Sequence, residues 1–147
     1  SNKKMFIGEY NHNLDSKGRI SMPVKFRSEL GSSAIVTKGL DACLFVYPKE
    51  EWQKMTEKLA QLPIANSSAR SFSRLMLSGA MELEFDKQGR AVLPAYLRDY
   101  AGLKNGVIAA GVLNRVELWD KKAWSLYSDS SESNASENAD NLAEWGI

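Results

Sequence analysis

The chain of 147 residues contains the segment DSKGRISMPVKFR at residues 15–27 and a second version of it, DKQGRAVLPAYLR, at residues 86–98. Asp, Gly, Arg, Pro and the final Arg occupy the same positions in both segments. The likeness continues downstream, where Gly31 corresponds to Gly102 and, after one inserted residue, Trp52 corresponds to Trp124. Such a duplication indicates two related units that bury a shared core by packing on one another.

In both copies, the Asp-x-x-Gly-Arg sequence predicts a tight hairpin turn. An Asp side chain accepts hydrogen bonds from turn amides, and Gly adopts the positive φ that tight turns need. The residues that we assign to the structure of these turns are Asp15, Gly18, Asp86, Gly89 and Arg90. A short strand is expected after each turn.

A helix of about two turns follows each strand, because Pro suits the start of a helix and Gly suits its end. Pro23 and Pro94 mark the starts, and Gly31 and Gly102 mark the ends. Runs rich in β-branched and aromatic residues then predict two more strands per copy, at 34–37 and 43–47 and at 107–110 and 116–119. Each copy is therefore predicted as strand-strand-helix-strand-strand, in a mixed α+β fold that is mostly β.

Longer helical patterns connect the copies. Apolar residues recur at helical spacing after Pro48, and again after the polar stretch 66–68. We expect two amphipathic helices that pack on the β core, with any exposed remainder available for subunit contacts. The predicted organisation is a first repeat at 5–52, connecting helices at 53–78, a second repeat at 79–127 and a tail at 128–147.

The charge of the chain is unevenly distributed. Residues 128–147 hold five acidic residues and no Lys or Arg, so this tail carries −5 while the whole chain carries +1. The remainder therefore carries +6, as expected for a protein that meets polyanions. The tail is rich in Ser, Asn and Glu and poor in aromatic residues, which predicts a flexible segment.

Several classes of protein are disfavoured by composition. No apolar run approaches the ~20 residues that cross a bilayer, and no signal segment opens the chain, so we expect a cytoplasmic protein without membrane association. One His and one Cys supply neither a typical zinc site nor a catalytic set. His12 matches the apolar Leu83 of the second copy and is expected to be partly buried. We expect no enzyme activity, metal, cofactor or small-molecule substrate.

The motifs together resemble one family. The segments Gly8-Glu9-Tyr10 and 13–19, the second turn at 86–90 and the segment 117–120 resemble the MraZ family over about residues 5–127. The resemblance implies tandem swapped-hairpin units of the AbrB type, forming a pseudo-twofold, double-psi-like β-barrel flanked by helices. It also implies a ring-shaped homo-oligomer at the nucleoid that binds promoter direct repeats of the division and cell-wall gene cluster.

The two copies differ in the charge around their turns, which favours the first copy as the DNA face. The outward residues before the first turn are Asn11 and Asn13, whereas Glu82 and Glu84 precede the second. Carboxylates repel phosphate, while Asn donates hydrogen bonds to it or to base edges. Residues 13–27 carry +3, and residues 84–98 carry +1.

Five residues are therefore candidates for contact with double-stranded DNA, and they are Asn13, Lys17, Arg19, Lys25 and Arg27. Arg19 is the central candidate, because a guanidinium reads guanine bidentately and binds phosphate equally well. The alternative for Arg19 is a purely structural pair with Asp15 across the turn. Lys17 is expected to contact phosphate, and Lys25 and Arg27 either do so or face solvent without a partner.

Four functions are compatible with these patterns to different degrees. The first is a sequence-specific DNA-binding transcriptional regulator that acts as a homo-oligomer. The second is a ring-forming protein-interaction module whose basic turns are only structural. An enzyme ranks far behind both, and an antitoxin-like role rests on fold analogy alone.

Overall fold

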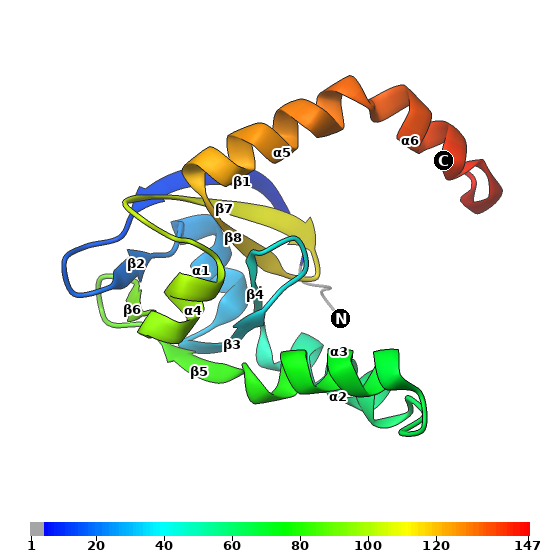
Figure 1. Ribbon diagram of the computed structural model, residues 1–147. Helices are drawn as coiled ribbons and strands as arrows, with labels where there is room; N and C mark the ends of the chain where they lie inside the picture. The colour runs from blue at the N-terminus through cyan, green and yellow to red at the C-terminus, as the bar shows by residue number, and fades with distance from the viewer. Residues whose placement is uncertain (1–4) are drawn as a thin grey trace.

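A computed structural model describes residues 5–147, and the order of its elements confirms the predicted repeat (Figure 1). The elements of the first copy are β1 (Phe6–Asn13), β2 (Arg19–Ser21), α1 (Val24–Leu30), β3 (Ser33–Lys38) and β4 (Leu44–Tyr47). Those of the second copy are β5 (Met81–Glu84), β6 (Arg90–Val92), α4 (Ala95–Tyr100), β7 (Gly106–Leu113) and β8 (Val116–Asp120). Both copies are strand-strand-helix-strand-strand.

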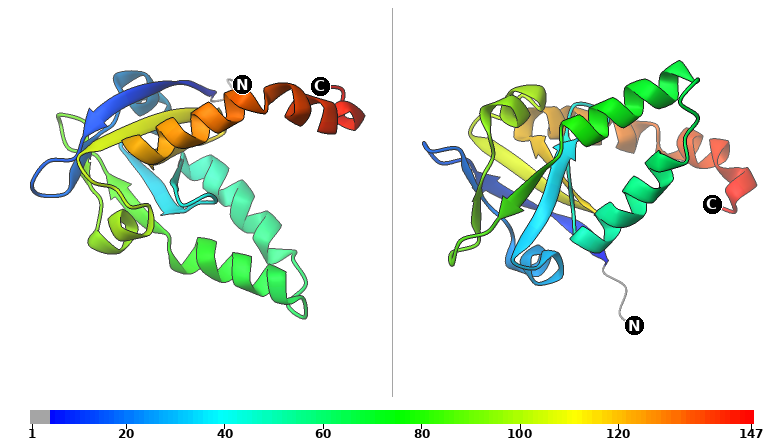
Figure 2. Two further views of the ribbon diagram at one scale, coloured as in Figure 1. Left: turned by 45° about the horizontal axis from the view of Figure 1, so that its top comes forward. Right: turned by 90° about the horizontal axis from the view of Figure 1, so that it is seen from below.

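The remaining regular elements are helices. Helices α2 (Lys49–Ala60) and α3 (Ser67–Ser78) connect the copies and form a hairpin that projects from the sheet (Figure 2). After β8 come α5 (Lys121–Ser133), α6 (Ala135–Asn141) and the short 3-10 helix η1 (Ala143–Trp145). Side chains cap two of these helices, because Asn66 accepts from the Ala69 amide at 2.9 Å and Asp120 accepts from the Ala123 amide at 3.2 Å.

The two copies exchange strands. The six-stranded sheet has the order β1-β7-β8-β4-β3-β5, and all of its pairs are antiparallel. Strand β1 of the first copy pairs with β7 of the second, and β5 of the second pairs with β3 of the first. A separate ribbon joins β2 to β6, again one strand from each copy. Neither copy has a complete set of strand partners without the other.

This exchange places the two strands of each predicted hairpin in different pairs. The turn itself is tight, since the Gly18 amide donates to the Asp15 carbonyl at 3.0 Å. The strands on either side of it do not pair with each other, however, because β1 pairs with β7 and β2 pairs with β6. The hydrogen-bonded sheet also ends at β1 and β5 without closing, so the predicted barrel is not confirmed.

One hydrophobic core is shared by both copies. It joins Phe6, Ile20 and Phe26 of the first copy to Ala91 and Leu97 of the second. The ring of Phe6 meets that of Phe26 edge to face, with centroids 5.7 Å apart. Gly111 allows β1 to approach β7, because a Cβ there would collide with the β1 backbone at Phe6 and Ile7.

A second cluster lies where the helices meet the sheet. Tyr47, Met76 and Trp119 are buried in it, and Trp52 and Trp124 pack against it from α2 and α5. All three of these tryptophans therefore pack where the helices meet the sheet, although Trp52 and Trp124 are only partly buried. The hydroxyl of Thr37 donates to the Met76 carbonyl at 2.6 Å and so fixes α3 to β3.

Residues 128–147 have regular secondary structure in the last part of α5, in α6 and in η1. Most of their side chains are exposed, and this helical arm extends away from the sheet (Figure 1). The flexibility predicted for these residues stays a prediction, since helical structure alone says nothing of how firmly the arm is held. Over residues 5–147, no helix is long and apolar enough to cross a bilayer.

Candidate nucleic-acid interface

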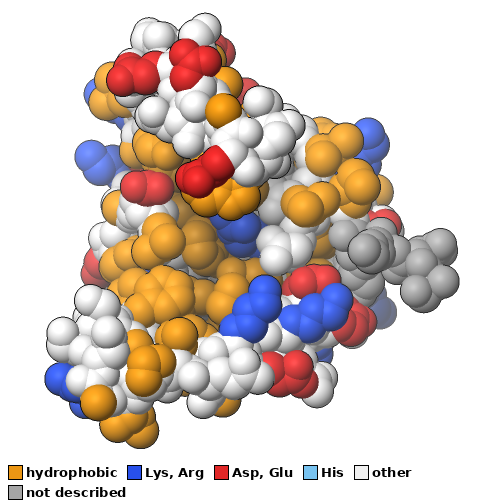
Figure 3. All heavy atoms as spheres, turned by 90° about the vertical axis from the view of Figure 1, so that its right-hand side faces the viewer, with side chains coloured by type: hydrophobic (Ala, Val, Ile, Leu, Met, Phe, Trp, Pro, Cys, Tyr) orange, Lys and Arg blue, Asp and Glu red, His pale blue; other side chains and the backbone are white. Residues whose placement is uncertain are grey.

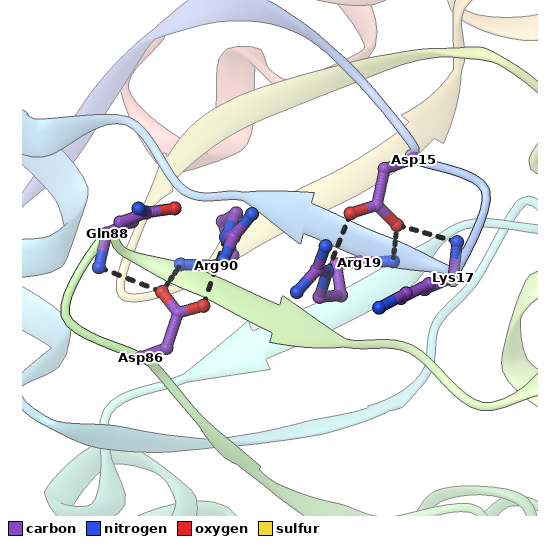
Figure 4. Close-up of polar contacts among 6 residues, drawn as sticks. All are labelled: Asp15, Lys17, Arg19, Asp86, Gln88 and Arg90. Carbon is purple, nitrogen blue, oxygen red and sulfur yellow. Dashed lines mark hydrogen bonds and ion pairs between the residues drawn. The ribbon is translucent and has the colours of Figure 1, made fainter.

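The first turn is organised by one carboxylate. Asp15 Oδ1 accepts hydrogen bonds from the amides of Lys17 and Arg19, both at 2.9 Å. Its Oδ2 accepts from Arg19 Nε at 2.6 Å, so the ion pair expected as the structural alternative is present (Figure 4). That pair uses only Nε, which leaves Nη1 and Nη2 of Arg19 without an acceptor among residues 5–147.

The second turn has the same geometry. Asp86 Oδ1 accepts from the amides of Gln88 and Arg90, both at 2.9 Å, and Oδ2 accepts from Arg90 Nε at 3.0 Å. Figure 4 shows the two turns at opposite ends of the β2–β6 ribbon, with each Arg held against its own Asp. Backbone and ion-pair geometry therefore does not distinguish the two turns.

The β2–β6 ribbon presents both arginines on its outer face. Arg19 lies opposite Val92, and Arg90 lies opposite Ser21, while the central pair Ile20 and Ala91 points into the core. Because side chains alternate along a strand, Arg19 and Arg90 share the other face. Val92 on that face is 55% exposed, and the Arg19 side chain is 27% exposed.

Each turn is also supported by the other copy. The Leu93 amide donates to the Gly18 carbonyl at 2.9 Å, and the Met22 amide donates to the Gly89 carbonyl at 3.0 Å. Both glycines have positive φ. The exchanged strands thus hold the two turns on a common ribbon.

Two further arginines cross from one copy to the other. The guanidinium of Arg98 lies over Gly18, where an added Cβ would be 2.9 Å from Nη1. Arg27 lies in the same way over Gly89, with no room for a Cβ. The Nε atoms of both are buried without a hydrogen-bond partner within residues 5–147. Arg27 belongs to the first copy and is expected near the first turn, but its side chain lies at the second turn.

The remaining candidates are distributed around the first turn. Lys17 is exposed at its tip, Lys25 is exposed on α1, and Asn13 is the exposed last residue of β1, opposite Gly106. The two turns exchange one arginine each, because Arg98 lies at the first turn and Arg27 lies at the second. The charge difference between the turns is therefore unchanged. Exposed Glu82 and Glu84 still precede the second turn, where Lys49 Nζ lies 3.6 Å from Glu82 Oε2.

The residues that could ligate a metal or act as a nucleophile are dispersed over the described chain. Within the described chain, no group of three His, Cys, Asp or Glu residues is placed to hold a metal ion. Cys43 is buried in the loop just before β4, and burial raises the pKa of its thiol well above the ordinary value. His12 is partly buried on β1, as predicted.

The turn hydrogen bonds lower the pKa of Asp15 below its ordinary value of 3.8, first through the Arg19 amide and then through the Arg19 side chain. A carboxyl with a lowered pKa stabilises the fold above its ordinary pKa and loses that contribution as the pH falls through the folded value. Wild type is therefore expected to be more stable than Asp15→Asn at pH 7, and this difference should shrink as the pH falls below 3.8 and vanish only below the lowered pKa of the folded chain. Urea unfolding at pH 7 and at a series of pH values below 3.8 measures the difference.

The control for this experiment is Asp129→Asn, which changes a carboxylate on α5 that is outside both turns. Its difference from wild type should be small at every pH. A stability difference between wild type and Asp15→Asn that stays constant with pH would show that the turn does not hold this carboxylate in its ionised form.

The fold and the turns define a class of protein: a tandem-repeat α+β protein whose copies exchange strands and share one ribbon with two Asp-x-x-Gly-Arg turns. Comparison with known proteins narrows this class. The sequence profile of the family described as "MraZ protein, putative antitoxin-like" matches residues 5–75 and again residues 76–144. The chain therefore belongs to the MraZ family, as the sequence predicted.

Relatives match over nearly the whole chain. A protein of Halothermothrix orenii is 54% identical over 143 residues, which are 97% of this chain and 100% of that protein. A protein of Syntrophomonas wolfei is 50% identical over the same shares, and one of Lactobacillus gasseri is 51% identical over 95% of both chains. All three carry the name Transcriptional regulator MraZ.

Proposed function

We propose that this protein is a sequence-specific, DNA-binding transcriptional regulator. It binds direct repeats in the promoter of the division and cell-wall gene cluster, as a ring-shaped homo-oligomer located at the nucleoid in the cytoplasm. The names of its relatives support the regulatory role. The cluster and the ring come from the family resemblance.

The observation that carries the proposal is the β2–β6 ribbon. A two-stranded ribbon fits the major groove, and its outer face here holds Arg19 with two unused guanidinium nitrogens. The Asp15 pair fixes the direction of that side chain before DNA arrives, which reduces the ordering entropy of binding. Arg19 is therefore proposed to read a base or to clamp a phosphate.

The first turn, rather than the second, is proposed to contact DNA. Lys17 at its tip is exposed and contacts phosphate, and Asn13 donates to phosphate or a base edge. Exposed Glu82 and Glu84 repel phosphate at the second turn. Lys25 on α1 adds a phosphate contact, whereas Arg27 reaches DNA only if the second turn is also close to it.

Oligomerisation compensates for the small size of this face. One ribbon with a few basic residues binds weakly, whereas several ribbons in one assembly gain effective concentration on repeated sites. The two units of each chain are proposed to close into the double-psi-like barrel expected from the resemblance. The proposed units remain 5–52 and 79–127, with connecting helices at 53–78 and an acidic, flexible tail at 128–147.

The spacing of the DNA repeats tests this arrangement. Repeats whose centres lie about 10 to 10.5 base pairs apart present the same face of the duplex to neighbouring subunits. Inserting about 5 base pairs between them rotates one site by half a turn. Fluorescence anisotropy is expected to show binding weakened by about tenfold or more, because the gain from linkage is lost.

The matched control is an insertion of about 10 base pairs, which restores the rotational phase. It should recover most of the lost affinity. Equal affinity for all three DNAs would contradict binding by linked subunits.

A second candidate function is a ring-forming protein-interaction module without specific DNA binding. The observation that favours it is the exposed apolar surface of the helical hairpin, where Leu62, Ile64 and Leu77 face solvent. An oligomer that binds promoter and scrambled DNA equally weakly would make this module the better description.

A further inference from the structure

The helical hairpin α2–α3 contains an apolar groove that this chain leaves open. The groove has a volume of about 480 Å³. It is lined from both helices and from the loop between them, by Leu59, Leu62, Pro63, Ile64, Arg74 and Leu77 among others. Ile64 is 83% exposed and Leu77 is 47% exposed, and both line the same apolar groove.

The charge of the groove is entirely basic. Arg70 and Arg74 are its charged lining residues. Arg70 Nη1 donates to the carbonyls of Ile64 and Ala65 at 3.0 and 3.2 Å and so holds the loop in place. The Arg74 side chain has no ion pair within residues 5–147. An occupant with apolar and acidic side chains would complement this surface.

The C-terminal arm has those properties. Leu142, Trp145 and Ile147 are exposed near its end, and Trp145 is 67% exposed. Asp140 and Glu144 alternate with them, and the arm has no basic residue after Lys122. Leu142 lies at the turn between α6 and η1, and Trp145 is the last residue of η1, whose amide donates to the Leu142 carbonyl at 3.0 Å.

The arm does not reach the groove of its own chain. In Figure 1 it leaves the top of the sheet, while α2 and α3 project from the bottom. Figure 3 shows the wide region between them, where hydrophobic side chains are gathered with Lys and Arg side chains beside them and acidic side chains on the arm above. The helical hairpin and the C-terminal arm both project away from the two turns, so the acidic arm does not cover the proposed DNA face of its own chain (Figure 2).

We propose that residues 140–147 of one copy dock in the α2–α3 groove of a second copy. Trp145 and Leu142 fill the groove, and Asp140 and Glu144 pair with Arg70 and Arg74. The inference deepens the proposed function, because it rests on the homo-oligomer and names the surfaces that join its subunits. It also gives the acidic arm a role that is separate from DNA binding.

Cross-linking between full-length chains tests this docking. One chain carries Leu77→Cys in the groove and the other carries Ile147→Cys in the arm, and the two are mixed and oxidised. Cys43 is fully buried and forms the common background. Non-reducing electrophoresis is expected to show a dimer band at least about tenfold stronger than for Lys104→Cys mixed with Ile147→Cys, because docking raises the effective concentration of the thiols.

Exchanging the charges of Arg74 and Glu144 in the same two cross-linking chains tests the ion pair proposed between these residues. Arg74→Glu alone or Glu144→Arg alone should lower the yield about threefold to fivefold, in keeping with an exposed pair. Combining the two on opposite chains should restore it. Because both residues are exposed, neither change is expected to prevent folding.

Three results would overturn the docking. The protein could sediment as a homo-oligomer while the Leu77–Ile147 cross-linking yield equals that of the Lys104 control. That result would retain the oligomer and reject docking in the groove. Strong cross-linking of the Ile147→Cys chain to itself would show that the arms pair with each other. A chain that sediments as a monomer at every concentration would reject the docking together with the proposed oligomer, while DNA binding is measured separately.

Discussion

Replacing Arg19 with alanine is expected to remove the preference of the protein for its own promoter over scrambled DNA. A bidentate contact to guanine contributes about 1–3 kcal/mol of discrimination, which is about fivefold to 150-fold in affinity per site. The loss should be larger in an oligomer, since several subunits lose the contact together. Fluorescence anisotropy with promoter and scrambled duplexes measures both affinities. If Arg19 binds only phosphate, affinity falls equally for both DNAs and the salt slope decreases by about 1.

The matched control is Arg90→Ala. Arg90 has the same ion pair, the same amide hydrogen bonds on its Asp and a place on the same face of the ribbon. Loss of structural support is therefore similar in both variants, and only the surroundings differ. We expect Arg90→Ala to change promoter affinity by less than about threefold, as for an exposed pair. Equal losses in both variants would show that both turns contact DNA, and the assignment to the first copy would be wrong.

Replacing Phe6 with alanine is expected to destabilise the whole chain. Phe6 is fully buried and packs on Phe26, at the point where β1 joins the second copy through β7. Truncation of a buried Phe costs about 3–5 kcal/mol through lost burial and the cavity left behind. The free energy of unfolding in urea should fall by this amount. Because the copies exchange strands, both should unfold in one transition.

The neighbouring residue supplies the control. Ile7 has the same place in the β1–β7 ladder, but its side chain points to the other face and is 66% exposed. Ile7→Ala should therefore change the free energy of unfolding by no more than about 0.5 kcal/mol. Two separate transitions in the Phe6→Ala chain would contradict a core shared by both copies.

The internal repeat made much of this fold predictable from sequence. Pro23 and Pro94 do precede helices, and Gly31 and Gly102 follow them with positive φ. The order of the elements and the long helices between the copies were also predicted correctly. These features depend on residues that are close together in the sequence, so each segment is enough to predict its own helix or strand.

The strand partners were not predictable in the same way. An alternating strand such as β1 buries the same residues whether it pairs within its copy or with the other one. The predicted turns are present, but the strands on either side of them pair with the other copy, an exchange that only the resemblance to swapped-hairpin units implied. The placement of Arg27 over Gly89 and of Arg98 over Gly18 follows from the same exchange, so no local pattern predicted it.

The candidate site was predictable to a similar extent. The Asp-Arg pairing across both turns follows from the spacing of four residues, and the structure has it in both copies. The shared outer face of Arg19 and Arg90 was missed, because it depends on the pairing of β2 with β6. The open groove between α2 and α3 was not predicted. The amphipathic pattern indicates an apolar helix face but does not distinguish a covered face from an exposed one.

The most direct test of the central claim is the salt dependence of binding to the upstream promoter of the gene and to a scrambled duplex. Specific binding by a basic ribbon predicts higher affinity for the promoter at every salt concentration, with a linear fall of log affinity against log salt. Equal, weak binding to both duplexes across the series would contradict the account, and the turns would then be structural parts of an assembly module.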